Sequence, residues 1–340
     1  MGTVSQEYII SEFQNNRDLI SCSSNFSRHQ NSITSSPQSL SNFLGRPSFI
    51  LCCEPDKATF INTVIDVTYL VNKTNWIFQQ PPSINSRPYQ YQNSLEKLAF
   101  CLDDMRTKQP DQKITQLRRM GKEESMYILE QSFLRAAEWF SNFSEFRELE
   151  DYVKLEIIKT AWFGWIRLEK LSETADYQRK QIFTEDVHMV GNDTCMKYGS
   201  FEIDISWCTD YSMEQLMFYI PPQEEQNCRQ CVQDLIDLSL TNIEVNFMLL
   251  QVSLSQAGKR CQGKVLEACE KLIQTQADHL HDYYVNKMKQ PNYSGRLTKM
   301  LKVIRQLEED IRNRSELNKL AKLFNVLKLE FSHPEMFDVH

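Results

Sequence analysis

The segment EFRELEDYVKLEIIKTAWFGWIRLEKL, Glu145 to Leu171, carries the strongest indication of fold in this 340-residue chain. A helix on the surface of a globular protein carries one apolar stripe and one polar face. In the second half of this segment, apolar side chains instead cover nearly every side of the helical wheel: Ile157, Ile158, Ala161, Trp162, Phe163, Trp165, Ile166 and Leu168. We therefore expect this helix to lie at the centre of the protein, with other helices packed around it.

The composition favours a helical protein with a large core. Only 9 Gly and 11 Pro occur in 340 residues, which suits long helices. The net charge of −7 argues against a general attraction to nucleic acid or to anionic membranes. No apolar run approaches the roughly 20 residues of a membrane span, and no signal peptide is apparent. We expect a cytosolic or nuclear chain whose ten cysteines are free thiols.

The apolar spacing predicts one all-α domain with a small β element. The first 45 residues are rich in Ser, Asn and Gln and predict a flexible arm. A helix is expected after Pro55 and Asp56, with one face formed by Phe60, Val64, Val67 (or Ile65, Tyr69) and Val71. Further helices are predicted at Lys122–Phe143, Val232–Gln256, Val265–Met288 and Arg296–Lys328, the last with a break near Arg312. A hairpin is expected within residues 188–208, where Phe201, Ile203, Ile205 and Trp207 alternate with other residues.

Motifs that carry enzyme or metal chemistry are weak in this sequence. Cys228 and Cys231 have the spacing of half a zinc knuckle, but no second such pair or His-x-x-x-His follows, so we favour two ordinary thiols. His279 and His281 point about 200° apart on a helix and cannot bind one metal ion from it. Phosphate loops, nucleophile elbows and zincin motifs are absent. We expect no catalytic residue, metal ion or cofactor.

The central segment also carries a family resemblance. Phe146, Leu149, Lys154, the run Ile157-Ile158-Lys159 and Trp162 resemble the F-x-x-L and L-L-K-x-x-W signature of nuclear receptor ligand-binding domains. The preceding AAEWFSNFSEF resembles the end of the third helix of that family, with Trp139 in the place of its tryptophan. The resemblance implies an all-α fold, a three-layer antiparallel helical sandwich with a small β-hairpin.

Two segments before the signature resemble the expanded nematode (supplementary) group of these receptors. Residues 43–49, FLGRPSF, through IDVTYLV are similar to its hinge, and VSQEYIISEFQNNRDLIS is similar to the segment after its last zinc finger. The zinc modules themselves do not occur in this sequence, so we expect no direct DNA binding by this chain. The implied organisation is an arm at residues 1–45, a hinge with one helix at 46–90, and a ligand-binding domain at 91–340 that ends in an activation helix.

The resemblance implies a groove that binds coregulator proteins. In the family, the activation helix closes over the third and fourth helices, and charges at both ends of the groove hold a partner L-x-x-L-L helix. Glu335, Met336 and Phe337 fit the activation helix, which Pro334 shortens. Ser141 replaces the basic residue of the family at the other end. The expected groove residues on the fourth helix are Lys154, Leu155, Ile158 and Lys159, although a solvated helix face explains both lysines equally well.

Other family features fall on further residues. Phe133, Ala137 and Trp162 are candidates for a ligand pocket, and each is equally explicable as core. Glu244 and Arg296 stand where the family joins two helices by a salt bridge. The charged helix from Arg296 to Ile311 stands at the dimer seam of the family, and solvent exposure explains its charges as well.

We expect from the resemblance a nuclear receptor-type transcriptional regulator, located in the nucleus with the cytoplasm left open. Its partners would be coregulator proteins or another nuclear receptor, with no membrane partner. Whether it also binds a lipophilic small molecule is left open. The alternative is a helical scaffold or sequestering partner whose pocket is filled by its own side chains. A cavity of several hundred cubic ångströms, on the order of a drug-sized site, would separate the first from the second.

Overall fold

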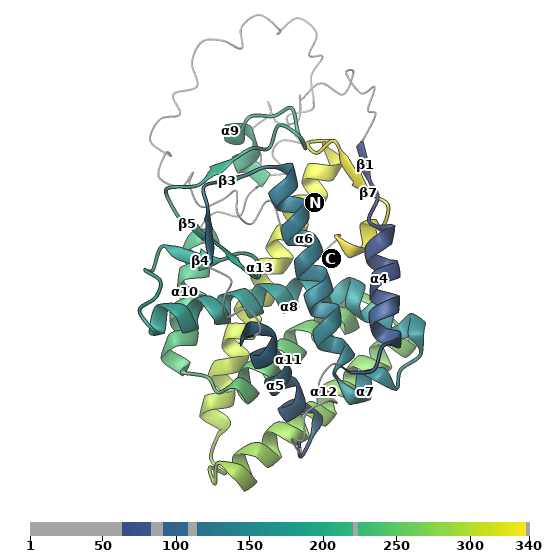
Figure 1. Cartoon of the computed structure of the whole chain (residues 1–340), viewed down its shortest axis with the longest axis vertical. Helices are drawn as coiled ribbons and strands as arrows, with labels where there is room; N and C mark the ends of the chain where they lie inside the picture. Colours follow the sequence, from purple (N-terminus) through teal and green to yellow (C-terminus); the bar gives the residue numbers. More distant parts are fainter. Residues whose placement is uncertain (1–62, 83–90, 108–113, 220–223, 338–340) are drawn as a thin grey trace, which may run out of the picture.

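The structure, a computed structural model, describes residues 63–82, 91–107, 114–219 and 224–337. It confirms the all-α fold class: helices dominate and the strands are short (Figure 1). The helices are α4 (Thr68–Gln79), α5 (Ser94–Thr107), α6 (Lys122–Ser141), α7 (Ser144–Arg147), α8 (Asp151–Arg179), α9 (Met213–Leu216), α10 (Glu224–Leu238), α11 (Asn242–Arg260), α12 (Lys264–Asp282) and α13 (Ser294–Leu323). Single turns are η3 (Met217–Tyr219), η4 (Tyr283–Lys287) and η5 (Pro334–Met336).

Helix α8 is the centre of three layers. It packs against α11 in the middle, α4 and α6 on one side, and α10 and α13 on the other. Figure 1 shows α8 crossing the molecule between α6 and α13. Nearly all of α8 from Val153 to Ala175 is buried, as its apolar wheel predicted. At Gly164 the amide end of the Gln256 side chain of α11 lies where a Cβ atom would stand, so glycine leaves room for this side chain.

Two predicted helix boundaries are wrong. Residues predicted as one helix from Val232 to Gln256 form α10 and α11, because the chain turns at Ser239, whose φ is 45°. Thr241 then caps α11: its hydroxyl accepts from the Glu244 amide, and the Glu244 carboxylate accepts from the Thr241 amide. In α13 the break expected near Arg312 is absent, because Ile311 and Arg314 are both buried and the helix continues between them.

The β elements join segments that are distant in the sequence. A hairpin is present, formed by β4 (Val187–Met189) and β5 (Thr194–Lys197), so its existence is confirmed but its strands precede the alternating residues. Strand β2 (Thr115–Leu117) pairs with β5, and β3 (Arg119–Met120) pairs with β6 (Glu202–Ile203), both in parallel.

The start of the first predicted helix is wrong where the structure describes it. Residues before 63 lie outside the described part of the chain. Thr63–Ile65 form the strand β1, which pairs in parallel with β7 (Leu329–Phe331), and helix α4 begins only at Thr68. The β-branched sequence Thr-Val-Ile suits a strand, and its partner lies more than 260 residues away.

Candidate functional site

The C-terminal segment expected as an activation helix forms the single turn η5. Pro334 begins this turn, and Met336 and Phe337 are buried. The Trp162 indole of α8 donates a hydrogen bond to the Met336 carbonyl oxygen at 2.8 Å. The Phe337 ring stacks on Phe331, with 3.9 Å between ring centroids. The turn is therefore docked against the middle of α8.

Lys159 and Glu335, two of the expected groove charges, lie at the same end of this site. The Lys159 Nζ atom is 2.9 Å from Glu335 Oε1. Burial alone would raise the pKa of Glu335, but hydrogen bonds from Lys159, from its own backbone and from His333 lower it to about 2. Lys154 lies elsewhere on α8 and pairs with Asp151 at 2.7 Å. Neither lysine therefore provides a basic group at the end of the site opposite Glu335.

A different cation, Arg147, stands at the other end. It follows Phe146 directly, and its Nη1 atom donates to the Ser141 carbonyl at 3.0 Å. Ser141 is the position where the family resemblance expects a basic residue, so the guanidinium lies beside the place where that charge is missing. The sequence reasoning missed Arg147, although its place within the Phe146-x-x-Leu149 motif was a usable signal.

An apolar face of α6 and α8 lies between these two ends, and helix α4 covers it. Ile158 of α8 is fully buried, and Leu155 is partly buried against the same core. Helix α4 packs on α6 and α8 through Leu70, Val71, Ile77 and Phe78. The Phe78 and Phe146 rings meet edge to face at 5.4 Å. We call the surface of α6, α7, α8 and η5 that lies between Arg147 and Glu335 the groove.

The expected pocket residues lie in a filled interior. Phe133 and Trp162 meet edge to face at 5.8 Å, and Ala137 is completely buried beside them in the core. A cavity of about 50 Å³ lies nearby, lined by residues that include Ser132, Phe163, Arg167, Lys170 and His188. A site for a drug-sized ligand is larger, on the order of 300 Å³ or more. None of the three candidates lines this cavity.

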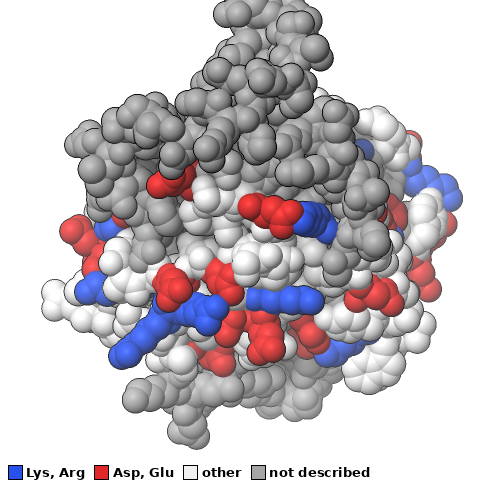
Figure 2. Space-filling view, turned by 90° about the horizontal axis from the view of Figure 1, so that it is seen from above, with Lys and Arg blue, Asp and Glu red and all other residues white. Residues whose placement is uncertain are grey.

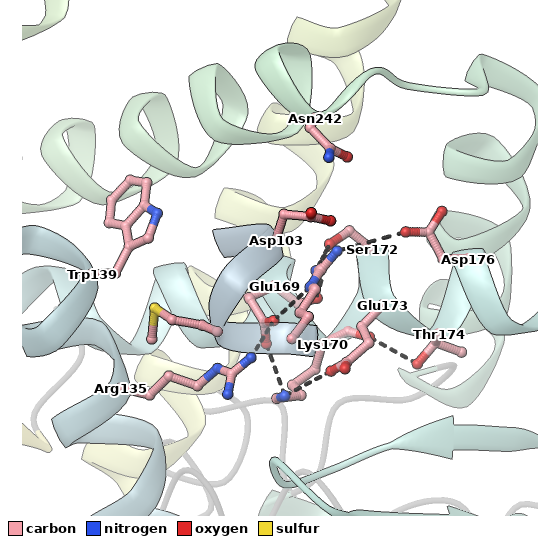
Figure 3. Close-up of polar contacts among 12 residues, drawn as sticks. Asp103, Arg135, Trp139, Glu169, Lys170, Ser172, Glu173, Thr174, Asp176 and Asn242 are labelled. Carbon is pink, nitrogen blue, oxygen red and sulfur yellow. Dashed lines mark hydrogen bonds and ion pairs between the residues drawn. The ribbon is translucent and has the colours of Figure 1, made fainter. Parts of the chain in front are cut away.

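Buried charges hold the helices around this interior. Glu169, which is fully buried, forms ion pairs with Lys170 at 2.9 Å and with Arg135 of α6 at 3.5 Å (Figure 3). It also accepts a hydrogen bond from Arg106 of α5 at 3.1 Å. Lys170 also contacts Glu173 at 2.8 Å. Burial alone would raise the pKa of Glu169, but the three cations hold it well below its usual range. These polar contacts link α5, α6 and α8 inside the protein.

The expected salt bridge between α11 and α13 is brought together by the fold. Arg296 contacts both carboxylate oxygens of Glu244, and its Nη2 atom lies 2.7 Å from Oε2. Tyr284 donates to the same carboxylate, and Arg296 also donates to the Leu238 carbonyl at 2.9 Å. Burial alone would raise the pKa of Glu244, and the bonds from Arg296 and Tyr284 outweigh it and lower the pKa. The pair fixes the junction of α10, α11 and α13.

The remaining candidate groups do not converge. Cys231 is buried and burial raises its pKa, while the Cys228 sulfur lies 3.5 Å from Arg167. His279 lies 3.4 Å from the Ser94 hydroxyl, and His281 lies 2.7 Å from the Tyr293 hydroxyl, on different partners. Within the described ranges, no group of three or more His, Cys, Asp or Glu side chains is placed to hold a metal ion.

Figure 2 shows acidic and basic side chains interspersed over the face that it draws. Such mixing gives that face no broad basic patch for a phosphate backbone. Among the helices that the structure describes, none has the length and apolar character of a membrane span.

The helical fold is that of the ligand-binding domain class of nuclear receptors, and comparisons agree. A model of the ligand-binding domain of nuclear hormone receptor matches residues 110–324. The chain is 51% identical over 327 residues to nuclear hormone receptor family member nhr-134 of Caenorhabditis elegans, covering 96% of this chain and 80% of that protein. It is 49% identical over 330 residues to family member nhr-96 of the same organism, covering 97% and 82%. The chain belongs to the nuclear hormone receptor family.

Proposed function

We propose that this chain regulates transcription in the nucleus by binding coregulator proteins, or another receptor, at the groove. The observation that carries the proposal is the placement of Arg147 and Glu335 at opposite ends of an apolar surface. A partner helix leaves amide groups unpaired at its N-terminus and carbonyl groups unpaired at its C-terminus. An acidic group at one end and a guanidinium at the other match those two needs.

The test is a reporter assay with the full chain tethered to a heterologous DNA-binding domain. We expect reporter output to differ from that of the DNA-binding domain alone, and Glu335→Ala and Arg147→Ala each to return it toward that baseline. Glu316→Ala is the matched control, because Glu316 is exposed and pairs only with Lys319 of its own helix among described residues. Reporter output unchanged by the chain, or unaffected by both groove variants, contradicts the proposal.

We further propose that this regulation works through protein contacts without a lipophilic ligand. Trp162 is enclosed by Phe133, Phe163 and Phe337, and the charged network of Glu169 occupies the neighbouring interior. This filling favours the alternative of a self-filled domain that scaffolds or sequesters its partners. Native mass spectrometry of the purified chain tests it: we expect the mass of the chain alone, and a retained small molecule lost on organic extraction would contradict the idea.

A further inference from the structure

Helix α4 lies in the groove in the orientation that a partner helix would take. At its N-terminal end, the Val67 amide donates to Ser332 Oγ at 2.9 Å, two residues before the turn η5. At its C-terminal end, Arg147 Nη2 donates to the Gln80 carbonyl at 2.9 Å. The two ends of the groove therefore already hold the free amide and carbonyl groups of a helix from this chain.

The apolar face of α4 has the spacing of the motif that such grooves accept. Thr74, Ile77 and Phe78 occupy positions i, i+3 and i+4, the spacing of L-x-x-L-L, and all three are buried. Leu70 and Val71 extend the same face by one turn. Tyr69 and Lys73 hold the side of the helix to Glu130 of α6, at 3.1 Å and 3.6 Å. The opposite face is open to solvent, and Trp76 is 60% exposed.

One position fits poorly. Thr74 stands where the motif has its first leucine, and among the described residues its buried hydroxyl has no hydrogen-bond partner. An unsatisfied buried hydroxyl destabilises the docked helix. A partner with leucine at that position would avoid this cost and fill the same space with apolar atoms.

We propose that α4 is an exchangeable occupant of the groove, and that a partner binds by presenting an amphipathic L-x-x-L-L helix that displaces it. The inference rests on the proposed function, since it assigns the partner to the same surface. The apparent affinity for a partner is then the intrinsic affinity of the open groove multiplied by the fraction of molecules in which α4 is released. The chain thus limits its own coregulator binding.

Titration of the full chain with a labelled synthetic L-x-x-L-L peptide, read by fluorescence anisotropy, tests the proposal in both directions. Ile77→Asp places a carboxylate in the apolar interface and releases α4, so we expect peptide affinity to rise by roughly tenfold or more. Thr74→Val removes the unsatisfied hydroxyl and so stabilises the docked α4. We expect it to lower peptide affinity several-fold, on the order of the free-energy cost of one unsatisfied buried hydroxyl. Trp76→Ala is the control on the exposed face of the same helix and should leave affinity unchanged.

Equal affinity of wild type and Ile77→Asp for this peptide would overturn the proposal. If neither binds it, a labelled peptide of residues 66–80 separates the two hypotheses. Capture of that peptide by Ile77→Asp alone supports an exchangeable α4 and counts against the L-x-x-L-L partner of the proposed function. No capture overturns the exchange itself.

Hydrogen exchange of the wild-type chain covers the case in which Ile77→Asp does not fold. We expect the amides of Leu70 to Phe78 to exchange through local opening, faster than the buried amides of α8. Added L-x-x-L-L peptide should reduce protection in α4 alone. Exchange of α4 only together with α8, in global unfolding, would overturn the proposal.

Discussion

Lys159 of α8 and Glu335 of the C-terminal turn form an ion pair, with 2.9 Å between Nζ and Oε1. The pair joins the centre of the fold to the end of the described chain. Trp162, three residues after Lys159, adds its hydrogen bond to the Met336 carbonyl. Together these contacts fix the position of the turn that closes one end of the groove.

The stability that the docked turn gains from the charge of Glu335 should be lost at acidic pH. The folded chain lowers the pKa of Glu335 from an ordinary 4.5 to about 2. A lowered folded pKa gives stability that is complete above the unfolded pKa and is lost as the pH falls through the folded value. We expect the difference in unfolding free energy between wild type and Glu335→Gln to be constant above about pH 5 and to vanish toward about pH 2.

Urea titrations of both proteins at several pH values measure that difference. Other acidic groups titrate alike in the two proteins and cancel. A difference that does not change with pH between these limits would show that the carboxylate charge is not engaged by Lys159.

Removing the buried charge of Glu169 should destabilise the fold strongly. In Glu169→Gln the cations Arg106, Arg135 and Lys170 lose their shared carboxylate, and breaking a buried ion pair costs about 3–5 kcal/mol. The surface variant Glu316→Gln should change stability by less than about 0.5 kcal/mol, because its pair with Lys319 is exposed. Urea unfolding of both variants at neutral pH checks the contrast, and equal effects would refute it.

Arg296 should not be replaceable by lysine without loss. Its guanidinium reaches both oxygens of Glu244 and the Leu238 carbonyl, which one ammonium group cannot do. We expect Arg296→Lys to lower the unfolding free energy by about 1–2 kcal/mol. Arg312→Lys is the matched control, since Arg312 pairs with Glu309 on the exposed face of the same helix. Equal melting temperatures for the two variants would contradict a structural role of this pair.

Trp162→Ala should open a cavity in the filled interior. The indole is almost completely buried against Phe133, Phe163 and Phe337, and such truncations cost about 3–5 kcal/mol. Trp76→Ala, at an exposed tryptophan, should cost little. If the variant folds, added indole should raise its melting temperature and leave that of the wild type unchanged. A similar rise in the wild type would mean that the native interior already accepts a small apolar molecule.

The central helix, α6 and the all-α class could be predicted because their signals are local. The apolar residues around Trp162 leave no polar face, and only surrounding protein satisfies such a helix. The turn at Ser239–Thr241 was missed although Thr241-x-x-Glu244 has the pattern of a capping box. The apolar spacing alone predicted one helix across this turn, because apolar residues continue at helical spacing on both sides of it.

The site was only partly predictable. The sequence pointed to Glu335, Met336 and Phe337 as an activation helix, and these residues lie in and directly after the single turn η5. It could not show that Lys159 pairs with Glu335 instead of standing at the far end. The far end is set by Arg147, whose bond to Ser141 is local but whose bond to Gln80 joins segments 67 positions apart.

The all-α class and the burial of the helix around Trp162 followed from the sequence alone, because helix propensity and apolar spacing act over a few neighbouring residues. The folded structure was needed to show that β1 pairs with β7, that α4 lies along α6 and α8, and that Trp162 packs against Phe133. Some of these contacts join residues more than two hundred positions apart in the sequence. Local preferences cannot specify such contacts, because they form only when the whole chain folds.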